Sequence, residues 1–413
     1  MNEIKGGRLL FLAFAAAMGG FLFGYDTAVI NGGEQQIQRL WGLSGALHGC
    51  VMSSALWGTV LGALFGGRIT DRLGRKPTLF WVGVFYLVSA VWSGLAAGPW
   101  ALMVARFIGG LGVGVSSIAA PVYISEIAPA ERRGQLGGLF QFNIVLGMVV
   151  SQFVNWAIGT AGLGDATWRW MLGAESIPAL AFTLLCPFLV ESPRWLASQT
   201  SQTSRTSRTS QTFFSRPNLK PILLAFCVAM FNQLSGINAM MYFAKRVFEM
   251  AGMTASAALG TAAGLSIVLG LGTFAGLFLI DRLGRRQLLI IGTVGCIVAH
   301  FATAAAFLFD LGLLAALCIF PFIVFFALGQ GVVIWVFISE IFPQRFRAQG
   351  QSWGSFTHWM FCATLTFVFP IMAVRWAPWA IFGFFGTCLV AHLLWAIFIC
   401  PETKGKSLEE IKL

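Results

Sequence analysis

Charge is scarce in this sequence. Only 10% of its 413 residues are Asp, Glu, Lys or Arg, whereas 57% are hydrophobic, and the mean hydropathy is +0.78. A soluble domain of this length needs far more charge to cover its surface. The composition therefore excludes the soluble fold classes and indicates a chain whose apolar side chains face lipid or one another.

Paired spacings of metal ligands and cysteines are also missing. The eight cysteines stand singly in apolar segments and the four histidines are dispersed, so we expect neither a disulfide framework nor a metal site. No nucleophile and base are paired in a catalytic pattern, so we expect no enzyme and no cofactor. The first apolar segment is long enough to span a bilayer and lacks a clear cleavage site, so we expect no cleaved signal peptide.

Long apolar segments fill nearly the whole chain. A helix that spans a bilayer needs roughly 20 mostly apolar residues. The sequence predicts an all-α membrane protein with transmembrane helices at residues 9–30, 47–68, 77–97, 100–123, 134–158, 168–190, 218–245, 257–280, 287–309, 312–338, 348–374 and 378–400.

The distribution of basic residues along the chain indicates the membrane topology. The net charge of +11 could suggest a nucleic-acid partner. However, most of the Lys and Arg residues fall in the segments that are inside if both termini are cytoplasmic, which is the positive-inside pattern. We therefore expect no nucleic-acid partner. We predict a multi-pass protein of the inner (plasma) membrane with both termini in the cytoplasm.

One unit occurs twice in the chain. The run DRLGRK at residues 71–76 returns as DRLGRR at 281–286, and ISEI at 124–127 returns at 338–341. Glu191 returns as Glu402 at nearly the same offset. Each copy occupies the same place in its half, as expected for two parallel repeats around a central site. The predicted organisation is a pair of pseudo-symmetric six-helix bundles at 1–196 and 218–400, with a cytoplasmic linker at 197–217 and a tail at 401–413.

The repeated charged motifs predict an ion-pair latch at the cytoplasmic ends of the helices. Acidic and basic residues beside a glycine turn can pair in one conformation and separate in another. The alternative is topology anchoring by positive charge alone, but each copy also contains acidic residues, which favours the latch. The predicted gate residues are Arg68, Asp71, Arg72, Arg75, Glu126, Arg133, Glu191, Arg194, Asp281, Arg282, Arg285, Glu340, Arg347 and Glu402.

Together these motifs resemble the sugar porter family of the major facilitator superfamily. The matching segments run from the first helix to the C-terminus: GYDTAVI at 24–30, both DRLGR loops, RFIGG at 106–110, ESPRWL at 191–196, QLSGIN at 233–238 and PETKG at 401–405. The resemblance implies a twelve-helix major facilitator fold and sugar transport. Within the family, the sequence most resembles the bacterial proton-coupled xylose transporters.

Three charged residues fall inside predicted spans. Asp26 and Arg106 lie at similar depth on helices of the same half, and Glu175 lies in the sixth span. A charge at such depth is costly unless paired and is a functional candidate by default. We predict that Asp26 carries a proton, that Arg106 is its switchable partner and that Glu175 tunes the pair. The alternative is a static ion pair that holds the first bundle together. The resemblance favours coupling, because proton-coupled members have Asp at this position.

Amides and aromatic rings form the candidate sugar site. Amides bond to hydroxyl groups, and an aromatic face covers the apolar face of a sugar ring. Gln233 and Asn238 would point apart on a regular helix, but Gly236 between them permits a break. With the positions that the resemblance adds, the predicted substrate-binding residues are Phe23, Gln141, Asn232, Gln233, Asn238, Tyr242, Trp335, His358 and Trp359.

The sequence departs from the family pattern in several places. Asn232 stands where Gln is usual, Leu269 replaces an Asn, and His358 stands where Asn or Gln is usual. The segment GVVIW at 331–335 lacks both prolines of the usual Gly-Pro-x-Pro-Trp, which argues against a flexible outer half of this helix as a gate. The linker at 197–217 is shorter than the family's helical connection.

Together with the resemblance, the sequence predicts proton-coupled symport of a neutral monosaccharide, a pentose or a hexose, by alternating access. The partners would be the sugar, protons and the lipid bilayer, with the proton gradient as driving force and no cofactor. Two alternatives remain open: a facilitative uniporter with a structural Asp26–Arg106 pair, and a non-transporting sugar receptor. We expect a monomer.

Overall fold

The fold is a set of long helices. The computed structural model describes residues 6–129, 133–193, 195–196, 213–215, 218–342 and 346–404, and these ranges contain no strand. Twelve helices in them are long and apolar enough to cross a membrane by length and composition. The predicted count of twelve spans is therefore confirmed, and the chain is a multi-pass membrane protein.

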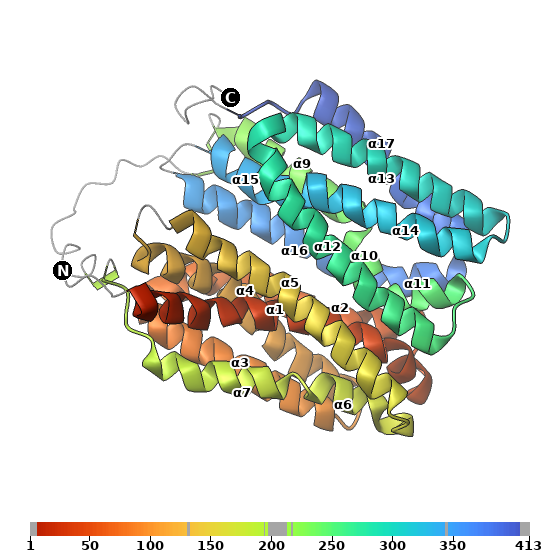
Figure 1. The fold of residues 1–413 in the computed structure, drawn as a ribbon, viewed down its shortest axis with the longest axis horizontal. Helices are drawn as coiled ribbons and strands as arrows, with labels where there is room; N and C mark the ends of the chain where they lie inside the picture. Colours follow the sequence, from red (N-terminus) through yellow and green to blue (C-terminus); the bar gives the residue numbers. More distant parts are fainter. Residues whose placement is uncertain are drawn as a thin grey trace. The chain divides into compact units, whose positions relative to one another are not determined.

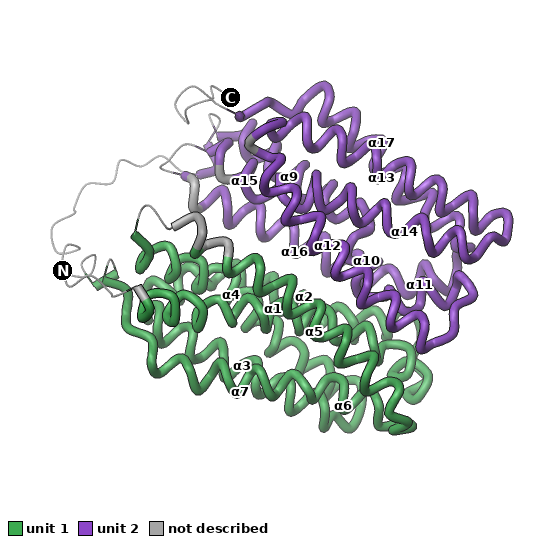
Figure 2. The backbone as a smooth tube through the Cα atoms, in the orientation of Figure 1, with its two compact units in different colours: residues 1–210 green, residues 211–413 purple. Residues whose placement is uncertain are grey.

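Two compact units divide the chain, residues 1–210 and 211–413 (Figure 2). In unit 1, five single helices are followed by a sixth span built from two shorter helices (Figure 1). Their bounds are α1 (Gly6–Leu40), α2 (Gly45–Leu73), α3 (Arg75–Leu95), α4 (Pro99–Ile127), α5 (Arg133–Thr160), η2 (Gly164–Ala166), α6 (Thr167–Gly173), α7 (Ser176–Leu185) and η3 (Cys186–Phe188).

Two of the spans in unit 2 are not continuous α-helices. Its seventh span is interrupted between α9 and α10, and its tenth contains a π-helical turn, η6, between α14 and α15. The bounds are α9 (Leu219–Leu234), α10 (Ile237–Tyr242), α11 (Ala244–Met250), α12 (Ala255–Leu283), α13 (Arg285–Leu308), α14 (Gly312–Phe326), η6 (Ala327–Gly331), α15 (Val332–Ile341), α16 (Arg347–Arg375) and α17 (Pro378–Phe398).

The same glycine turn follows the second long helix of each unit. Gly74 separates α2 from α3, and Gly284 separates α12 from α13, each with φ of 93°. This is the left-handed region that favours glycine. A side chain at either position would also meet the carboxylate of Glu191 or Glu402. The sequence repeat is thus reproduced in the backbone and in its acidic neighbour.

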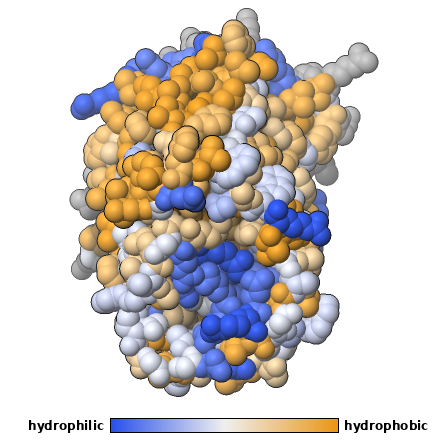
Figure 3. Space-filling model, turned by 90° about the vertical axis from the view of Figure 1, so that its right-hand side faces the viewer, coloured by the Kyte–Doolittle hydropathy of each residue, from blue (hydrophilic) through white to orange (hydrophobic). Residues whose placement is uncertain are grey.

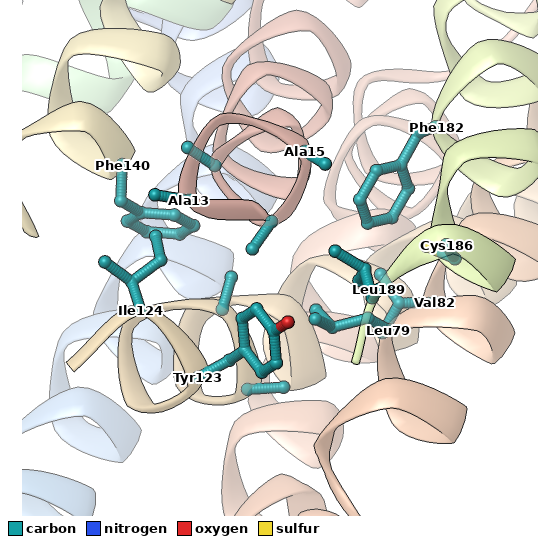
Figure 4. Close-up of a cluster of buried hydrophobic side chains, with 14 of the residues drawn as sticks. Ala13, Ala15, Leu79, Val82, Tyr123, Ile124, Phe140, Phe182, Cys186 and Leu189 are labelled. Atoms are coloured by element: carbon teal, nitrogen blue, oxygen red, sulfur yellow. The ribbon is translucent and has the colours of Figure 1, made fainter. Parts of the chain in front are cut away.

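The core of unit 1 combines small residues on α1 with large ones on its neighbours. Leu79 on α3, Tyr123 on α4 and Phe182 on α7 are fully buried. They pack around the alanines of α1, among them Ala13 and Ala15 (Figure 4). Small residues on a membrane helix let neighbouring helices approach closely. The alanine-rich stretch therefore lets α1 lie in the middle of its unit.

Apolar side chains also cover the outside of the helices. Leu95, Phe278 and Phe398 are each more than 60% exposed. Hydrophobic residues cover broad areas of the face drawn in Figure 3, and hydrophilic ones form a central patch and several smaller groups. Apolar patches of this extent are rare on soluble monomers and suit contact with lipid.

Helices α2 and α4 touch through glycine. A Cβ atom at Gly110 of α4 would collide with the backbone carbonyl of Ala55 on α2. Backbone cannot move aside as a flexible side chain can, so the two helices would have to separate. Gly67, on the same α2, has open space where its Cβ would be.

Gly110→Ala should therefore lower the stability of the protein by about 1–3 kcal/mol, the usual range for overpacking. Gly67→Ala is the matched control and should leave stability unchanged or raise it slightly, because Ala favours a helix over Gly. Thermal unfolding of the purified variants in detergent measures both. Equal melting temperatures for the two variants would contradict the close approach.

Candidate functional site

A buried acid and base meet between α1 and α4. Asp26 and Arg106 are each 2% exposed. The Arg106 guanidinium donates to Oδ1 of Asp26 and, over 3.0 Å, to the backbone carbonyl of the same residue. Gly109, one turn along α4, lets Ser89 of α3 lie close, since a Cβ there would collide with its hydroxyl. The predicted pair is thus formed and shielded from water.

Glu175 is the third member of this group. It lies between α6 and α7 and is also 2% exposed. Its Oε1 has no hydrogen-bond donor among the described residues, and its carboxyl is close enough to Asp26 and Arg106 to interact with the charges of both. Two carboxyls therefore face one guanidinium, and the group as a whole is neutral when it holds one added proton. Titrations of groups this close belong to the group rather than to one residue.

A chain of amides forms the centre of the candidate site in unit 2. Asn238 Nδ2 donates to Oε1 of Gln233 over 2.6 Å, and Gln233 Nε2 donates to Oδ1 of Asn232 over 3.1 Å. The same Nε2 lies 3.1 Å from both ring nitrogens of His358 on α16. Asn232 Nδ2 donates to the backbone carbonyl of Gln330 over 3.3 Å.

The break in the seventh span brings these amides together. Gly236 adopts φ of 83°, α9 ends at Leu234, and α10 begins at Ile237. Ser235 Oγ caps the break by accepting from the N–H of Ile237 over 3.4 Å. The expected break at Gly236 is present, and it lets Asn238 face back toward Gln233.

Aromatic rings enclose His358. The rings of Trp335 on α15 and Trp359 on α16 each lie 5.0 Å from the imidazole, centroid to centroid. Trp335 follows the π-helical turn η6, which changes the direction in which the following residues point. The tenth span is therefore irregular although it lacks the family's two prolines.

The other predicted substrate residues lie elsewhere. Phe23 on α1 and Gln141 on α5 are half-buried residues of unit 1. Tyr242 is buried at the end of α10 in unit 2. The amide network thus brings together Asn232, Gln233, Asn238 and His358.

The repeated charged motifs form one cluster at the end of unit 1. Arg75 donates to both carboxylate oxygens of Glu126, over 2.9 and 2.8 Å, and forms an ion pair with Asp71 at 3.1 Å. Its backbone N–H donates to Glu191 over 3.0 Å. The cluster joins the glycine turn after α2 to the end of α4 and to the segment after η3.

Unit 2 repeats this cluster. Arg285 donates to both oxygens of Glu340, over 3.0 and 2.7 Å, and its backbone N–H donates to Glu402 over 2.9 Å. Thr403 Oγ1 adds a bond to Glu340 over 2.6 Å. Bidentate bonds between guanidinium and carboxylate are among the strong ones in proteins.

The remaining gate predictions fall into two groups. Arg68, Arg72 and Arg282 are exposed at the ends of α2 and α12. The side chains of Arg133, Asp281 and Arg347, and the whole of Arg194, lie outside the part of the chain that the structure describes.

Comparisons with known proteins agree with this architecture. The family model for "Sugar (and other) transporter" matches residues 12–211 and 199–413. The chain belongs to the sugar porter family of the major facilitator superfamily. The predicted major facilitator fold is thereby confirmed, and so is the expectation of a transporter rather than an enzyme.

Individual sugar porters cover almost the whole chain. It is 32% identical to the arabinose-proton symporter of Bacillus subtilis (strain 168), over 98% of this chain and 95% of that one. It is 30% identical to the D-xylose-proton symporter of Escherichia coli (strain K12), over 97% and 94%. A solved inward-open structure of the xylose transporter XylE from E. coli aligns with a TM-score of 0.86 at 30% identity, over 98% and 99%.

One buried pair of this sugar porter escaped the sequence analysis. His48 Nε2 of α2 lies 2.8 Å from Oε2 of Glu34 on α1, and both side chains are fully buried. The first span was expected to end at residue 30, which placed Glu34 in a loop. Helix α1 continues to Leu40, so Glu34 lies inside it. An acid four residues beyond an apolar run was the signal that could have revealed the pair.

A second missed group is a set of buried amides between α1 and α5. Asn31 Nδ2 donates to Oε1 of Gln152 over 3.1 Å, and Asn155 Nδ2 donates to the backbone carbonyl of Val29 over 2.9 Å. All three amide side chains are fully buried. Their positions on opposing helices make them interhelical hydrogen bonds, for which one sequence gives no pairing signal.

Glu402 lies beyond the last span and is open to titration. Burial of its carboxyl raises the pKa, but hydrogen bonds from the backbone N–H groups of Lys404, Arg285, Arg286 and Thr403 outweigh burial and hold the pKa below the usual 4.5. A carboxyl whose pKa is lowered by folding stabilises the folded state above its unfolded pKa. That contribution is lost as the pH falls through the lowered pKa.

Glu402→Gln should therefore lower the melting temperature at pH 7 and flatten its decline at acid pH, where the wild type loses the same contribution. Melting curves between pH 7 and pH 3 measure this effect. Asp310→Asn, an exposed acid at a position where φ is 55°, is the control and should keep the wild-type acid profile. If the melting temperature of Glu402→Gln falls toward pH 3 as steeply as that of the wild type, the stabilising role given to the Glu402 carboxylate is wrong.

Proposed function

We propose that the protein is a proton-coupled symporter of a monosaccharide, a pentose or a hexose, that works by alternating access. The observation that carries this proposal is the dry group of Asp26, Arg106 and Glu175 in unit 1. It contains two acids and one base, so one proton more or less changes its net charge. A buried group of this kind responds to proton binding by changing its pairing.

Proton coupling follows from the presence of two carboxyls and only one guanidinium in this group. While Arg106 bonds to Asp26, the carboxylate of Asp26 is neutralised. If the guanidinium moves away, Asp26 is left as a charge in a dry site, and it can take a proton to become neutral. Glu175 competes for the same guanidinium and the same proton. Binding of a proton and release of Arg106 would therefore be linked.

The sugar side rests on the amide network of unit 2. Asn232, Gln233, Asn238 and His358 supply donors and acceptors, and Trp335 and Trp359 supply aromatic faces. This combination suits hydroxyl groups on an uncharged ring. Relatives whose names state their cargo, the arabinose-proton and D-xylose-proton symporters, support a sugar carried with a proton.

The membrane setting extends the proposal. We place the protein in the plasma membrane with both termini in the cytoplasm, as the positive-inside pattern predicts. The Arg75–Glu126 and Arg285–Glu340 clusters then lie on the cytoplasmic side. They hold the helix ends of their own units in one arrangement, and their loss should favour another.

A facilitative uniporter is the second candidate. Arg106 contacts both the carboxylate and the backbone carbonyl of Asp26, which also suits a permanent structural pair. In that case the sugar would move down its gradient without a proton. Asp26→Asn separates the two functions, because Asn keeps the shape of the side chain and cannot titrate.

Asp26→Asn should abolish uphill accumulation of labelled D-xylose, D-glucose or L-arabinose in proteoliposomes. Exchange between equal sugar concentrations should continue. A gradient of one pH unit drives a one-proton symporter to about tenfold accumulation at most, so wild type and variant should differ by up to that factor. Asp165→Asn, an exposed acid in η2, is the control and should accumulate sugar as the wild type does. Uphill accumulation by Asp26→Asn, or sugar entry without proton uptake by the wild type, would favour the uniporter.

A further inference from the structure

The break in the seventh span is built around Ser235. Its backbone N–H donates to the carbonyl of Phe231 over 3.1 Å, and its Oγ donates to the carbonyl of Asn232 over 2.6 Å. The same Oγ accepts from the N–H of Ile237 over 3.4 Å. These three hydrogen bonds stay within the span. Ser235 therefore closes α9 and opens α10 with its own polar groups, and the remaining group to account for is its carbonyl oxygen.

The carbonyl of Ser235 is satisfied from another helix. Helix α10 begins with a bond from the N–H of Met240 to the carbonyl of Gly236 over 3.0 Å, so Ser235 lies just before its first turn. Nε2 of His300 on α13 lies 2.9 Å from the carbonyl oxygen of Ser235, and both residues are buried. A carbonyl without a donor is costly inside a membrane, and a broken spanning helix persists where neighbouring groups supply that donor.

This contact fixes the state of the His300 ring. A carbonyl oxygen can only accept, so Nε2 must carry a hydrogen, and in the neutral ring Nδ1 is then bare. Nδ1 has no hydrogen-bond partner among the described residues. The ring lies 4.3 Å from that of Phe322 on α14, centroid to centroid, and packs on Phe382 and Phe385 of α17. In these apolar surroundings His300 serves as a neutral donor.

The backbone next to this bond has freedom that needs restraint. Gly236 adopts φ of 83°, a conformation that glycine reaches without strain, and glycine reaches many others as easily. The ring of Phe385 packs against it so closely that a Cβ there would lie 2.9 Å from the ring. Without a donor to the Ser235 carbonyl, the peptide that joins Ser235 to Gly236 could turn. The bond from His300 therefore holds the direction in which α10 leaves the break.

The direction of α10 decides where Asn238 lies. Asn238 is in the first turn of α10, three residues after Ser235, and its Nδ2 donates back across the break to Oε1 of Gln233 over 2.6 Å. Gln233 is on α9 and is fully buried, whereas Asn238 is half-buried. A rotation of α10 at Gly236 would thus carry Asn238 away and leave Gln233 in place.

We propose that His300 is a positioning residue for sugar binding. Its Nε2–H holds the carbonyl of Ser235, this bond fixes the break, and the fixed break keeps Asn238 against Gln233. His300 acts through the backbone of the seventh span and carries no proton in the transport cycle. The inference rests on the proposed sugar-binding function and adds to it a residue of α13.

Two substitutions of His300 test the role of Nε2. The amide nitrogen of Gln reaches about as far from the backbone as Nε2 of His, whereas that of Asn reaches only as far as Nδ1. His300→Gln should therefore bind sugar as the wild type does, and His300→Asn should bind it about three- to tenfold more weakly. The measurement is binding of labelled D-xylose, D-glucose or L-arabinose, whichever the purified full-length protein binds. Proton uptake per sugar in proteoliposomes should be unchanged in both variants.

His392 supplies the matched control in the same unit. It is as buried as His300, and its Nδ1 lies 3.1 Å from Oγ1 of Thr293 on the same helix, α13. Thr293 lies within a continuous helix rather than at a break. His392→Asn and His392→Gln should therefore both bind sugar as the wild type does.

A double-mutant cycle tests whether His300 acts through Asn238. Asn238→Ala removes the side chain that His300 is proposed to position. In that background, His300→Asn should slow sugar exchange at low sugar concentration by less than about twofold, because residues that act through one another are not additive. Initial exchange rates in proteoliposomes measure this even for variants that bind weakly.

The outcomes separate the positioning role from the proposed function. Equal affinities of His300→Asn and His300→Gln, or an additive effect in the Asn238→Ala background, would overturn the positioning role. So would an equal loss of affinity in the His392 variants, or loss of proton uptake in a His300 variant that still binds sugar. Binding is compared at a temperature at which melting curves show every variant folded. Failure of all three labelled sugars to bind the wild type would instead count against the proposed function.

Discussion

Lipid offers no hydrogen-bond partner to a polar side chain inside a span, so charged and amide groups there are stabilised by partners within the protein. This constraint explains why several buried groups of the protein occur in sets. Asp26 has Arg106, Glu34 has His48, and Asn31 has Gln152. A lone buried charge would be expelled or neutralised. The sets that remain are therefore the places where the fold tolerates polarity, and the two most extended ones form the candidate site.

The candidate groups of the two units differ in chemistry. Unit 1 concentrates ionisable side chains, with two carboxyls and a guanidinium in one dry space. Unit 2 concentrates amides, an imidazole and indoles, which carry no net charge when the imidazole is neutral. Under the proposed function, proton binding and the recognition of an uncharged ligand would thus occupy separate bundles. The repeated end clusters around Arg75 and Arg285 keep the same construction in both units, so the two units differ in their interiors.

The sequence predicted the architecture because its signals are long or repeated. Twelve apolar runs and a motif that returns in the second half leave few other folds, and Gly236 marked the break in the seventh span. The ends of the helices were harder to predict from the sequence. Helix α1 continues ten residues past its expected end, so Glu34 was placed in a loop. Partners across helices were not accessible at all. That Gln233 bonds to His358, 125 residues away, depends on packing that no local pattern encodes.

The π-helical turn η6 has a consequence for how this transporter can diverge from its relatives. A proline bends a helix by forbidding a hydrogen bond, and a π turn bends it by carrying one residue too many. In the tenth span Pro321 lies inside α14, and the π turn lies directly before Trp335. The bend next to Trp335 therefore depends on the length of the helix. Residues 332–334 are buried in the core of unit 2, so substitutions there act through packing, whereas loss of a single residue from 327–331 would rewind the helix and turn Trp335 away from His358.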